Sequence, residues 1–526
     1  MMQRMSQSEI IGGLVALLGE ARVSTSAPDV IAMSADLWPK AQIWKMSGEV
    51  ERHPPDCVVW PGTEAELSAV VAFCAEHGIP IVPYGGGSGV CGGTVPIHGG
   101  VVVDVKRMEG EVEIDRASLT VVAPAGINGQ HLEDRLNANG LTLGHFPSSI
   151  MCSTLGGWLA ARSAGQFSSC YGKIEDMVLS LRAVLPTGEI VDTEDRQSGD
   201  PDWTQVLVGS EGTLGLITSA RLRVHPSAKH RWLRGFRFHH LHDGLEGMRQ
   251  TMQAGLRPMV FRLYDPLDTF IAMNTGKSTD RGGLIDLLRS NSSSKEQGSG
   301  PATRLFQGLA RAGMSGGLAV PAALNRFAQA LPSNCKMVVG FEGPEEAVRI
   351  QSERAATILR REGGEDMGAG PGEHWLEHRY SVSFKQSRIY QAGAFVDTME
   401  VSTTWDRLEA LYEEVKKAVG PHAFIMAHFS HAYREGCSIY FTFAASRGAG
   451  DRAEAHYERI WQSALSAVHR AGASASHHHG VGLLKRDAMV EEHGNMLRVW
   501  RVLKDTLDPK GIMNPGKLFP DGAGGA

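Results

Sequence analysis

The chain has 526 residues, 42% apolar and 21% charged, with a net charge of −6 at pH 7. This balance is ordinary for a soluble globular protein and provides no basic surface that would favour nucleic acid or an anionic membrane as a general partner. The seven cysteines are scattered and form no Cys-x-x-Cys pair, which argues against a disulfide framework and a structural zinc site.

The first 52 residues are predicted to form a helical leader. Their apolar run at 10–18 is about half as long as a membrane span and is flanked by Glu9 and Glu20. We therefore predict a short amphipathic helix and no signal peptide.

From residue 56 the pattern alternates between strands and helices. Thr63 and Glu66 form a capping-box pattern, the apolar residues that follow recur at helical spacing, and Gly78 supplies the stop. A second α/β segment continues to about residue 226, with a helix predicted around 132–136. The predicted strands are 57–60, 79–83, 101–105 and 119–124.

The glycine-rich loop 84–93 contains the pattern G-x-G-x-x-G at 87–92. A Rossmann turn should open directly into a helix, but this loop leads to Thr94-Val95-Pro96 and another strand, so the Rossmann interpretation fails. The loop is rich in backbone N–H donors and poor in side chains, which suits a diphosphate. A purely structural turn is the alternative.

From about residue 230 the elements become longer and glycine becomes rarer. The segment 275–334 combines a Ser-rich stretch with Gly- and Ala-rich sequence. We interpret it as a solvated insertion, and the alternative is a lid or membrane-contacting element for an apolar substrate.

Five motifs in order resemble the FAD-binding domain of the vanillyl-alcohol-oxidase-type (PCMH-type) flavoproteins. They lie at 55–63, 83–89, 153–157, 171–176 and 209–218. The resemblance implies an α+β fold, with a two-subdomain FAD-binding domain followed by an α+β cap whose antiparallel sheet covers the flavin. The implied domains are a leader at 1–52, the FAD-binding domain at 53–228, the cap or substrate domain at 229–475 and a C-terminal segment at 476–526 that returns to the flavin site.

The same resemblance implies a set of cofactor-binding residues in the glycine loop, the later loops and the strand that follows them. Some relatives tether the flavin through a histidine in the first glycine loop, where this chain has Ser88, so we expect non-covalent FAD. The implied residues are Pro83, Tyr84, Gly85, Gly86, Gly87, Ser88, Gly89, Gly92, Gly93, Pro147, Ser148, Ser153, Thr154, Gly156, Gly157, Tyr171, Gly172, Glu211, Thr213 and Ile217.

Within these flavoproteins, four segments resemble alkylglycerone-phosphate synthase (alkyldihydroxyacetonephosphate synthase). They lie at 261–265, 400–406, 439–441 and 476–482, and the last contains three adjacent histidines. Enzymes of this kind use FAD to exchange the acyl chain of acyl-dihydroxyacetone phosphate for a fatty alcohol, with no net redox change. The resemblance therefore implies a transferase of ether lipid synthesis.

By this resemblance, Tyr440 is the essential active-site tyrosine and Arg262 binds the substrate phosphate. The triple-histidine segment is His477, His478 and His479. Histidine suits proton abstraction and return near neutral pH. A second family arginine falls at Lys385 or Arg388, because the alignment there needs a small gap.

Each of these residues also has a simpler interpretation. The histidines could form a metal site or a solvated turn, but neighbouring residues on a strand point alternately, so we predict no metal. Tyr440 could be a packing residue of an alternating strand, and Arg262 could pair with Asp265.

The competing function is an FAD-dependent oxidoreductase of a D-2-hydroxy acid or another alcohol. His428 and His431 motivate it, although the Gly-Asp-Gly-Asn core of the hydroxy-acid dehydrogenases is absent. We expect a phosphorylated lipid-like substrate and a fatty alcohol as partners, and no nucleic acid. The sequence leaves a homodimer and peripheral membrane contact open. The chain lacks a terminal Ser-Lys-Leu-type signal, so we expect a cytoplasmic protein.

Overall fold

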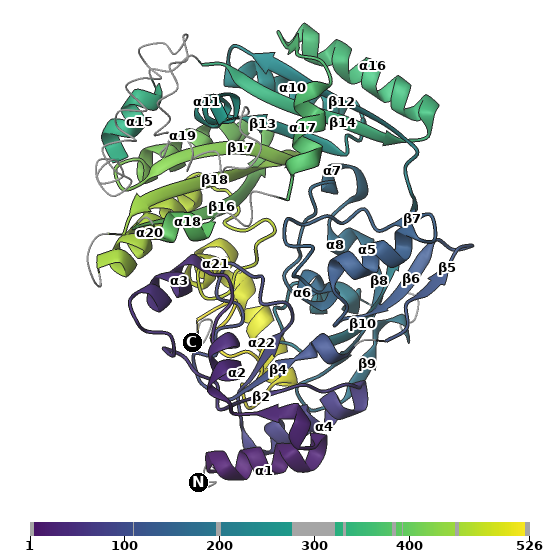
Figure 1. Cartoon of the computed structure of the whole chain (residues 1–526), viewed down its shortest axis with the longest axis vertical. Helices are drawn as coiled ribbons and strands as arrows, with labels where there is room; N and C mark the ends of the chain where they lie inside the picture. The colour runs from purple at the N-terminus through teal and green to yellow at the C-terminus, as the bar shows by residue number, and fades with distance from the viewer. Residues whose placement is uncertain are drawn as a thin grey trace. The chain divides into compact units, whose positions relative to one another are not determined.

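The computed structural model describes residues 5–108, 110–195, 201–275, 321–329, 333–380, 386–391, 393–447 and 452–520 (Figure 1). Most of the predicted insertion at 275–334 lies outside these residues. The chain divides into two compact units, each of which is described by itself. Unit 1 consists of Met1–Gly165, Tyr171–Ser227 and Ser476–Ala526, and unit 2 of Gln166–Cys170 and Ala228–Ala475.

The described part of unit 1 contains three sheets, of which the smallest pairs β7 with β11 in antiparallel fashion. The first has the order β1-β2-β4-β3, and its strands β2, β4 and β3 are parallel. The second has the order β5-β6-β10-β8-β9 and is antiparallel throughout. The strands are β1 (Val23–Ser24), β2 (Cys57–Val59), β3 (Ile81–Tyr84), β4 (Val101–Asp104), β5 (Glu113–Asp115), β6 (Thr120–Pro124), β7 (Leu141–Thr142), β8 (Val178–Val184), β9 (Ile190–Asp192), β10 (Leu216–Arg223) and β11 (His225–Pro226).

The helices of unit 1 cover these sheets. Helices α1 and α4 lie side by side (Figure 1) and share one apolar core with the first sheet, which includes Leu14, Val70 and Val101. The helices are α1 (Gln7–Leu18), α2 (Ala27–Ala32), α3 (Pro39–Met46), α4 (Glu64–His77), α5 (Gly129–Asn137), α6 (Leu155–Ala160), α8 (Ile174–Met177), α9 (Trp203–Leu207), α21 (Arg486–His493) and α22 (Leu497–Leu507).

Helix α4 begins and ends where the sequence predicts. The Thr63 side chain accepts a hydrogen bond from the Glu66 N–H, and Gly78 terminates the helix in the left-handed region with φ 65°. The predicted capping box is only half present. The Glu66 carboxylate accepts from the Gly62 N–H at 2.8 Å and pairs with Arg22, so it does not turn back to Thr63.

The C-terminal segment joins the first sheet of unit 1. The Ile81 N–H donates to the Ile512 carbonyl at 2.7 Å, and the Asn514 N–H donates to the Ile81 carbonyl at 2.8 Å. Lys504, on α22, donates to the Thr213 carbonyl at 2.7 Å and thereby ties this helix to a loop of the FAD motifs. Residues 476–520 are thus built into the same unit as the glycine loop.

Unit 2 is built on a seven-stranded antiparallel sheet with the order β15-β12-β14-β13-β17-β18-β16. Helices α10 and α16 lie over β12 and β14 (Figure 1). The strands are β12 (His230–Phe238), β13 (Val260–Tyr264), β14 (Cys335–Gly343), β15 (Glu365–Asp366), β16 (Ala394–Thr404), β17 (Phe424–Ala432) and β18 (Gly436–Ser446). The helices are α10 (Leu241–Gln253), α11 (Pro266–Thr275), α15 (Pro321–Gln329), α16 (Glu345–Arg361), α17 (Gly370–His378), α18 (Gln386–Gln391), α19 (Leu408–Val419) and α20 (Arg452–Arg470), and α7 (Ser168–Tyr171) begins in this unit.

None of the seven cysteines, all of which lie in the described residues, forms a disulfide bond. Among the described helices, none combines the length and the apolar character that a membrane span requires.

Candidate active site

The glycine loop of unit 1 follows β3, and at several positions the packing admits only glycine. A Cβ atom on Gly86 would lie 1.9 Å from the Cys152 carbonyl oxygen. At Gly87 it would lie 2.0 Å from the Tyr84 hydroxyl, and the φ of 61° at Gly87 also favours glycine. One side of the loop therefore packs closely against Cys152 and Tyr84 of unit 1.

The backbone N–H groups of residues 86–89 donate no hydrogen bond to any described part of the chain. Consecutive unpaired N–H groups form a nest for an anion. The packing of the glycines and these free donors fit the diphosphate of FAD, so the loop can hold the cofactor by backbone contacts.

A buried carboxylate from the N-terminal leader lies against this loop. The Leu37 N–H donates to the Gly89 carbonyl at 2.9 Å, and the Trp38 N–H donates to Asp36 Oδ1 at 3.0 Å. The other carboxylate oxygen, Oδ2, is buried and lacks a hydrogen-bond partner within the described residues. Burial raises the pKa of Asp36 to about 7. The leader thus contributes an ionisable group to the cofactor loop.

We expect Asp36→Asn to change how the stability of the protein depends on pH. The native state keeps a proton on Asp36 up to about pH 7, whereas the unfolded chain releases it near pH 4. Wild-type stability therefore falls as the pH rises from 5 to 8, by about 3 kcal/mol relative to the variant, and then levels off. Thermal unfolding of both proteins between pH 5 and 8 measures this difference.

Asp134→Asn is a matched control, because Asp134 is exposed on α5. It should show no such divergence from wild type. A constant difference in melting temperature between wild type and Asp36→Asn across this pH range would contradict the prediction.

The structure places all the predicted cofactor residues in unit 1. Some of them are already engaged within the unit. The Thr154 hydroxyl caps α6 by accepting from the Gly157 N–H at 3.3 Å. The Ser153 hydroxyl donates to the Ser149 carbonyl at 2.9 Å and accepts from the Trp158 indole at 2.7 Å. These contacts shape the loop, and direct contact of each residue with FAD stays a prediction.

Glu211 anchors the segment that follows the three histidines. It is half-buried, has a φ of 49° and accepts hydrogen bonds from the Val481 N–H at 2.6 Å and the Gly482 N–H at 2.9 Å. Burial raises the pKa of this carboxyl. A Cβ atom on Gly480 would lie 2.7 Å from Glu211 Oε1, so the chain can approach the carboxylate only with glycine there.

The triple-histidine segment lies in irregular structure, so the strand geometry used in the sequence prediction is wrong. The Nδ1 atoms of His477 and His478 are 2.9 Å apart, and one of them must donate to the other. The rings of His478 and His479 pack edge to face at 4.5 Å. In the described residues, no group of three or more His, Cys, Asp or Glu side chains is arranged to hold a metal ion.

The sheet of unit 2 carries a row of polar side chains across five strands. Tyr264 pairs with His428, His428 with Tyr440, and Tyr440 with Glu400. Paired residues share a face of the sheet. The pairing of Leu263 with Met337 places Lys336 beside Tyr264 in the same row, and Arg262 lies two residues before Tyr264 on that face.

Arg262 faces this row. Its Nη2 atom donates to His428 Nε2, and its buried Nε atom finds no partner in the described part of the chain. The alternative in which Arg262 pairs with Asp265 does not match the contacts of that carboxylate, which lies just past the end of β13. Asp265 instead accepts from the Tyr412 hydroxyl at 3.0 Å and the Ala427 N–H at 3.1 Å.

Burial determines the protonation of this row. It lowers the pKa of His428 well below its usual value, with the Arg262 charge acting in the same direction. The neutral ring stacks on Tyr440 at 4.8 Å. Burial raises the pKa of Tyr440 to about 12, so its hydroxyl keeps its proton at neutral pH. His428 Nδ1 lies 3.5 Å from Asp268, whose pKa burial raises to about 6.

Lys385 lies outside the described residues, and Arg388 is part of α18 without a described side chain, so their predicted role stays a prediction. His431 has a φ of 53° at an irregularity of β17, and its Nδ1 atom lies 2.6 Å from the Ser168 hydroxyl. It is thus engaged away from the row that contains His428.

The sequence reasoning missed Asp268 and Lys336. Lys336 is the one charged residue in the apolar strand segment 335–341, and an isolated charge in a buried strand is a recognisable signal. Asp268 gave no comparable signal, because α11 brings it to the row only through the fold.

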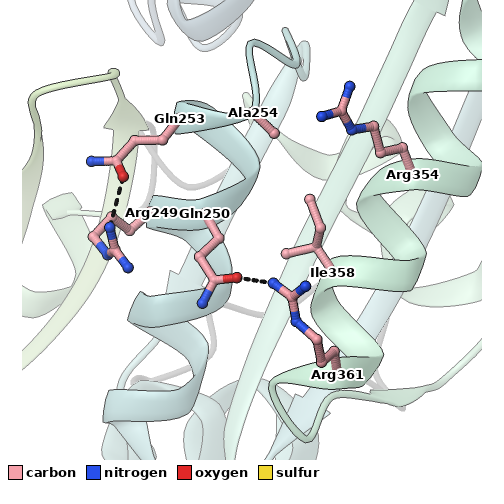
Figure 2. A pocket seen from close by; sticks show the side chains of 7 residues that line it. All are labelled: Arg249, Gln250, Gln253, Ala254, Arg354, Ile358 and Arg361. Atoms are coloured by element: carbon pink, nitrogen blue, oxygen red, sulfur yellow. Dashed lines mark hydrogen bonds between the residues drawn. The ribbon is translucent and has the colours of Figure 1, made fainter.

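A separate pocket of about 470 Å³ lies between α10 and α16 (Figure 2). Arg249 hydrogen-bonds Gln253 there, and Arg361 hydrogen-bonds Gln250. It contains none of the predicted site residues. The lining residues are Arg249, Gln250, Gln253, Ala254, Arg354, Ile358 and Arg361.

Two family models cover most of the chain. Residues 55–194 match an FAD binding domain, and residues 227–518 match the C-terminal domain of FAD linked oxidases. The chain belongs to the FAD-linked oxidase family. It is an FAD-dependent enzyme, which agrees with the donor nest of the glycine loop.

Its relatives place it more closely. The chain is 31% identical to alkyldihydroxyacetonephosphate synthase of Dictyostelium discoideum, over 89% of this chain and 74% of the relative. It is 28% identical to the synthase of Trypanosoma brucei brucei, over 91% of this chain and 75% of the relative. A solved alkyldihydroxyacetonephosphate synthase superposes with a TM-score of 0.76 at 26% identity, covering 98% of this chain and 87% of the other.

The predicted resemblance to the synthases is therefore confirmed, and so are FAD and the α+β fold. p-Cresol methylhydroxylase, at 14% identity and a TM-score of 0.72 over 98% of this chain and 97% of that one, shares the fold. The chain is an alkyldihydroxyacetonephosphate-synthase-like member of the PCMH-type FAD-binding flavoproteins.

Proposed function

We propose that this enzyme exchanges the acyl chain of an acyl-dihydroxyacetone phosphate for a fatty alcohol and so forms an ether lipid precursor. The observation that carries the proposal is the placement of Arg262 and Tyr440 on one face of one sheet, joined through His428. The names of the most similar relatives support the same reaction.

In this proposal, unit 1 binds FAD and unit 2 binds the head group of the substrate. When bound, FAD supplies an isoalloxazine ring that can act as a nucleophile or as an electron acceptor. The guanidinium of Arg262 can bind the phosphate through its unpaired Nε–H and its positive charge. A planar guanidinium suits phosphate, because its N–H donors match the spacing of the phosphate oxygens.

The proposed reaction also needs two proton transfers, which we assign to side chains of the protein. The protonated Tyr440 hydroxyl can donate a proton to the departing oxygen of the acyl group. A base must remove a proton from C1 of the substrate, and we assign this role to the triple-histidine segment. The contact between the Nδ1 atoms of His477 and His478 puts two imidazoles side by side in this segment, and imidazole takes up and releases protons near neutral pH.

The test is the visible spectrum of the FAD-loaded protein, mixed anaerobically with palmitoyl-dihydroxyacetone phosphate and then with hexadecanol. We expect the flavin band to bleach with the ester and to return with the alcohol, with ether formed and no electron acceptor required. An unchanged spectrum with no ether formed would overturn the proposal.

A second candidate is an FAD-dependent oxidoreductase of a 2-hydroxy acid or another alcohol. It is favoured by 25% identity to the mitochondrial D-lactate dehydrogenase (cytochrome) of Arabidopsis thaliana, over 89% of this chain and 74% of the relative. This function predicts that D-lactate, glycolate or an alcohol bleaches the flavin and that turnover requires an electron acceptor.

A further inference from the structure

Two cations lie close to the ring of Tyr264 in unit 2. The guanidinium carbon of Arg262 lies 5.5 Å from the ring centre, and Lys336 Nζ lies 5.3 Å from it. Lys336 comes from β14 and Arg262 from the neighbouring β13, with both side chains on the face of the polar row. Two positive charges are thus gathered around one aromatic ring.

The acidic side chain that faces both cations is Asp268. Among the described residues of this cluster, only Asp268 carries a negative charge that opposes the two cations. Burial raises the pKa of Asp268 to about 6. His428 is held neutral, and Glu400 lies at the far end of the row beyond Tyr440. This end of the row therefore keeps a surplus of positive charge.

Donors of both cations are left without partners. Arg262 Nε is buried and unpaired, and Lys336 Nζ makes no hydrogen bond or ion pair with the described part of the chain. The strand backbone holds Lys336 in place, since its N–H donates to the Thr269 hydroxyl at 2.9 Å. Half-buried cations without a matching anion are costly, and a bound anion would offset that cost.

We propose that Lys336 is the second phosphate-binding cation of the substrate site, acting with Arg262 beside Tyr264. This proposal rests on the proposed function and assigns to Lys336 the role that the sequence resemblance gave to Lys385 or Arg388. A phosphomonoester carries up to two negative charges and several acceptor oxygens. The Arg262 guanidinium and the Lys336 ammonium together supply two positive charges and several N–H donors, which match it. Burial lowers the pKa of Lys336, and a bound dianion would counteract that effect.

The test is binding of glycerol 3-phosphate to the FAD-loaded protein by isothermal titration calorimetry, with glycerol as the neutral comparison. We expect Lys336→Met to raise the Kd for glycerol 3-phosphate at least tenfold and Lys336→Arg to restore it to within about threefold of wild type. Lys417→Met removes the same charge from an exposed position on α19 and should leave the Kd unchanged.

Wild-type affinity in Lys336→Met would overturn the proposal, and so would a wild-type protein that does not distinguish glycerol 3-phosphate from glycerol. Near-wild-type melting temperature and FAD content in Lys336→Met show that a weaker Kd reflects the lost charge. If that variant does not fold, Lys336→Gln replaces it, and wild-type affinity in Lys336→Gln would equally overturn the proposal.

The same variants separate this proposal from the proposed function. Ether formation with an unchanged KM for the acyl substrate in Lys336→Met would leave the transferase function standing and remove the role of Lys336. Phosphate binding that depends on Lys336, in a protein that forms no ether, would support the anion site and overturn the transferase function.

Discussion

Replacing Tyr440 by phenylalanine should reduce turnover by about 10²- to 10⁴-fold while leaving FAD bound. The change removes only the hydroxyl, so the ring can still stack on His428 at the same place in the sheet. The lost group is the proton donor, and general acid catalysis is typically worth this factor. The measurement is kcat for ether formation, together with the flavin absorbance ratio of the purified protein.

Tyr457→Phe is the matched control. It also removes a buried tyrosine hydroxyl in unit 2, which donates to Asp397 at 2.6 Å. This variant should lose about 1–3 kcal/mol of stability and keep its turnover. Equal kcat in Tyr440→Phe and wild type would show that Tyr440 is a packing residue.

The second large effect is expected from Gly86→Ala, which should produce a protein without yellow colour. The new methyl group would lie 1.9 Å from the Cys152 carbonyl oxygen and 2.9 Å from the Ser153 Cα, and both atoms are backbone. Neither can rotate away, so the loop must move and the donor nest must change shape. Overpacking of about 3 kcal/mol corresponds to about a hundredfold weaker FAD binding.

The measurement is the Kd for FAD by fluorescence titration of the apoprotein. Gly12→Ala is the control, because a Cβ atom at Gly12 meets nothing within 4 Å on α1. It should bind FAD normally and gain roughly 0.5–1 kcal/mol of stability. Wild-type FAD affinity in Gly86→Ala would mean that residues 86–89 do not contact the cofactor.

Local patterns in the sequence were sufficient wherever neighbouring residues decide the structure. Helix α4 begins at Thr63 and ends at Gly78, because caps and positive φ are properties of a few consecutive residues. The glycine loop was also recognised in this way. The loop leads to a strand, whereas a Rossmann turn opens into a helix, and this local difference excludes the Rossmann pattern.

Other predictions failed where distant contacts compete with local ones. The Glu66 carboxylate completes no capping box, because Arg22 lies within reach only in the folded chain. The three histidines lie in irregular structure, and Glu211, far away in the sequence, binds the chain directly after them.

The sequence by itself determined the family and the cofactor. The alternation of apolar and polar residues also placed Arg262, Tyr264 and Tyr440 on recognisable strands. Periodicity and motif order are one-dimensional properties, so they survive without coordinates. Only the tertiary structure decided that β13, β14, β17 and β18 are neighbours in the sheet. That order gives Arg262 the partner His428 and brings Lys336 beside Tyr264. The register between strands depends on pairing across the whole sheet, so the sequence alone does not provide it.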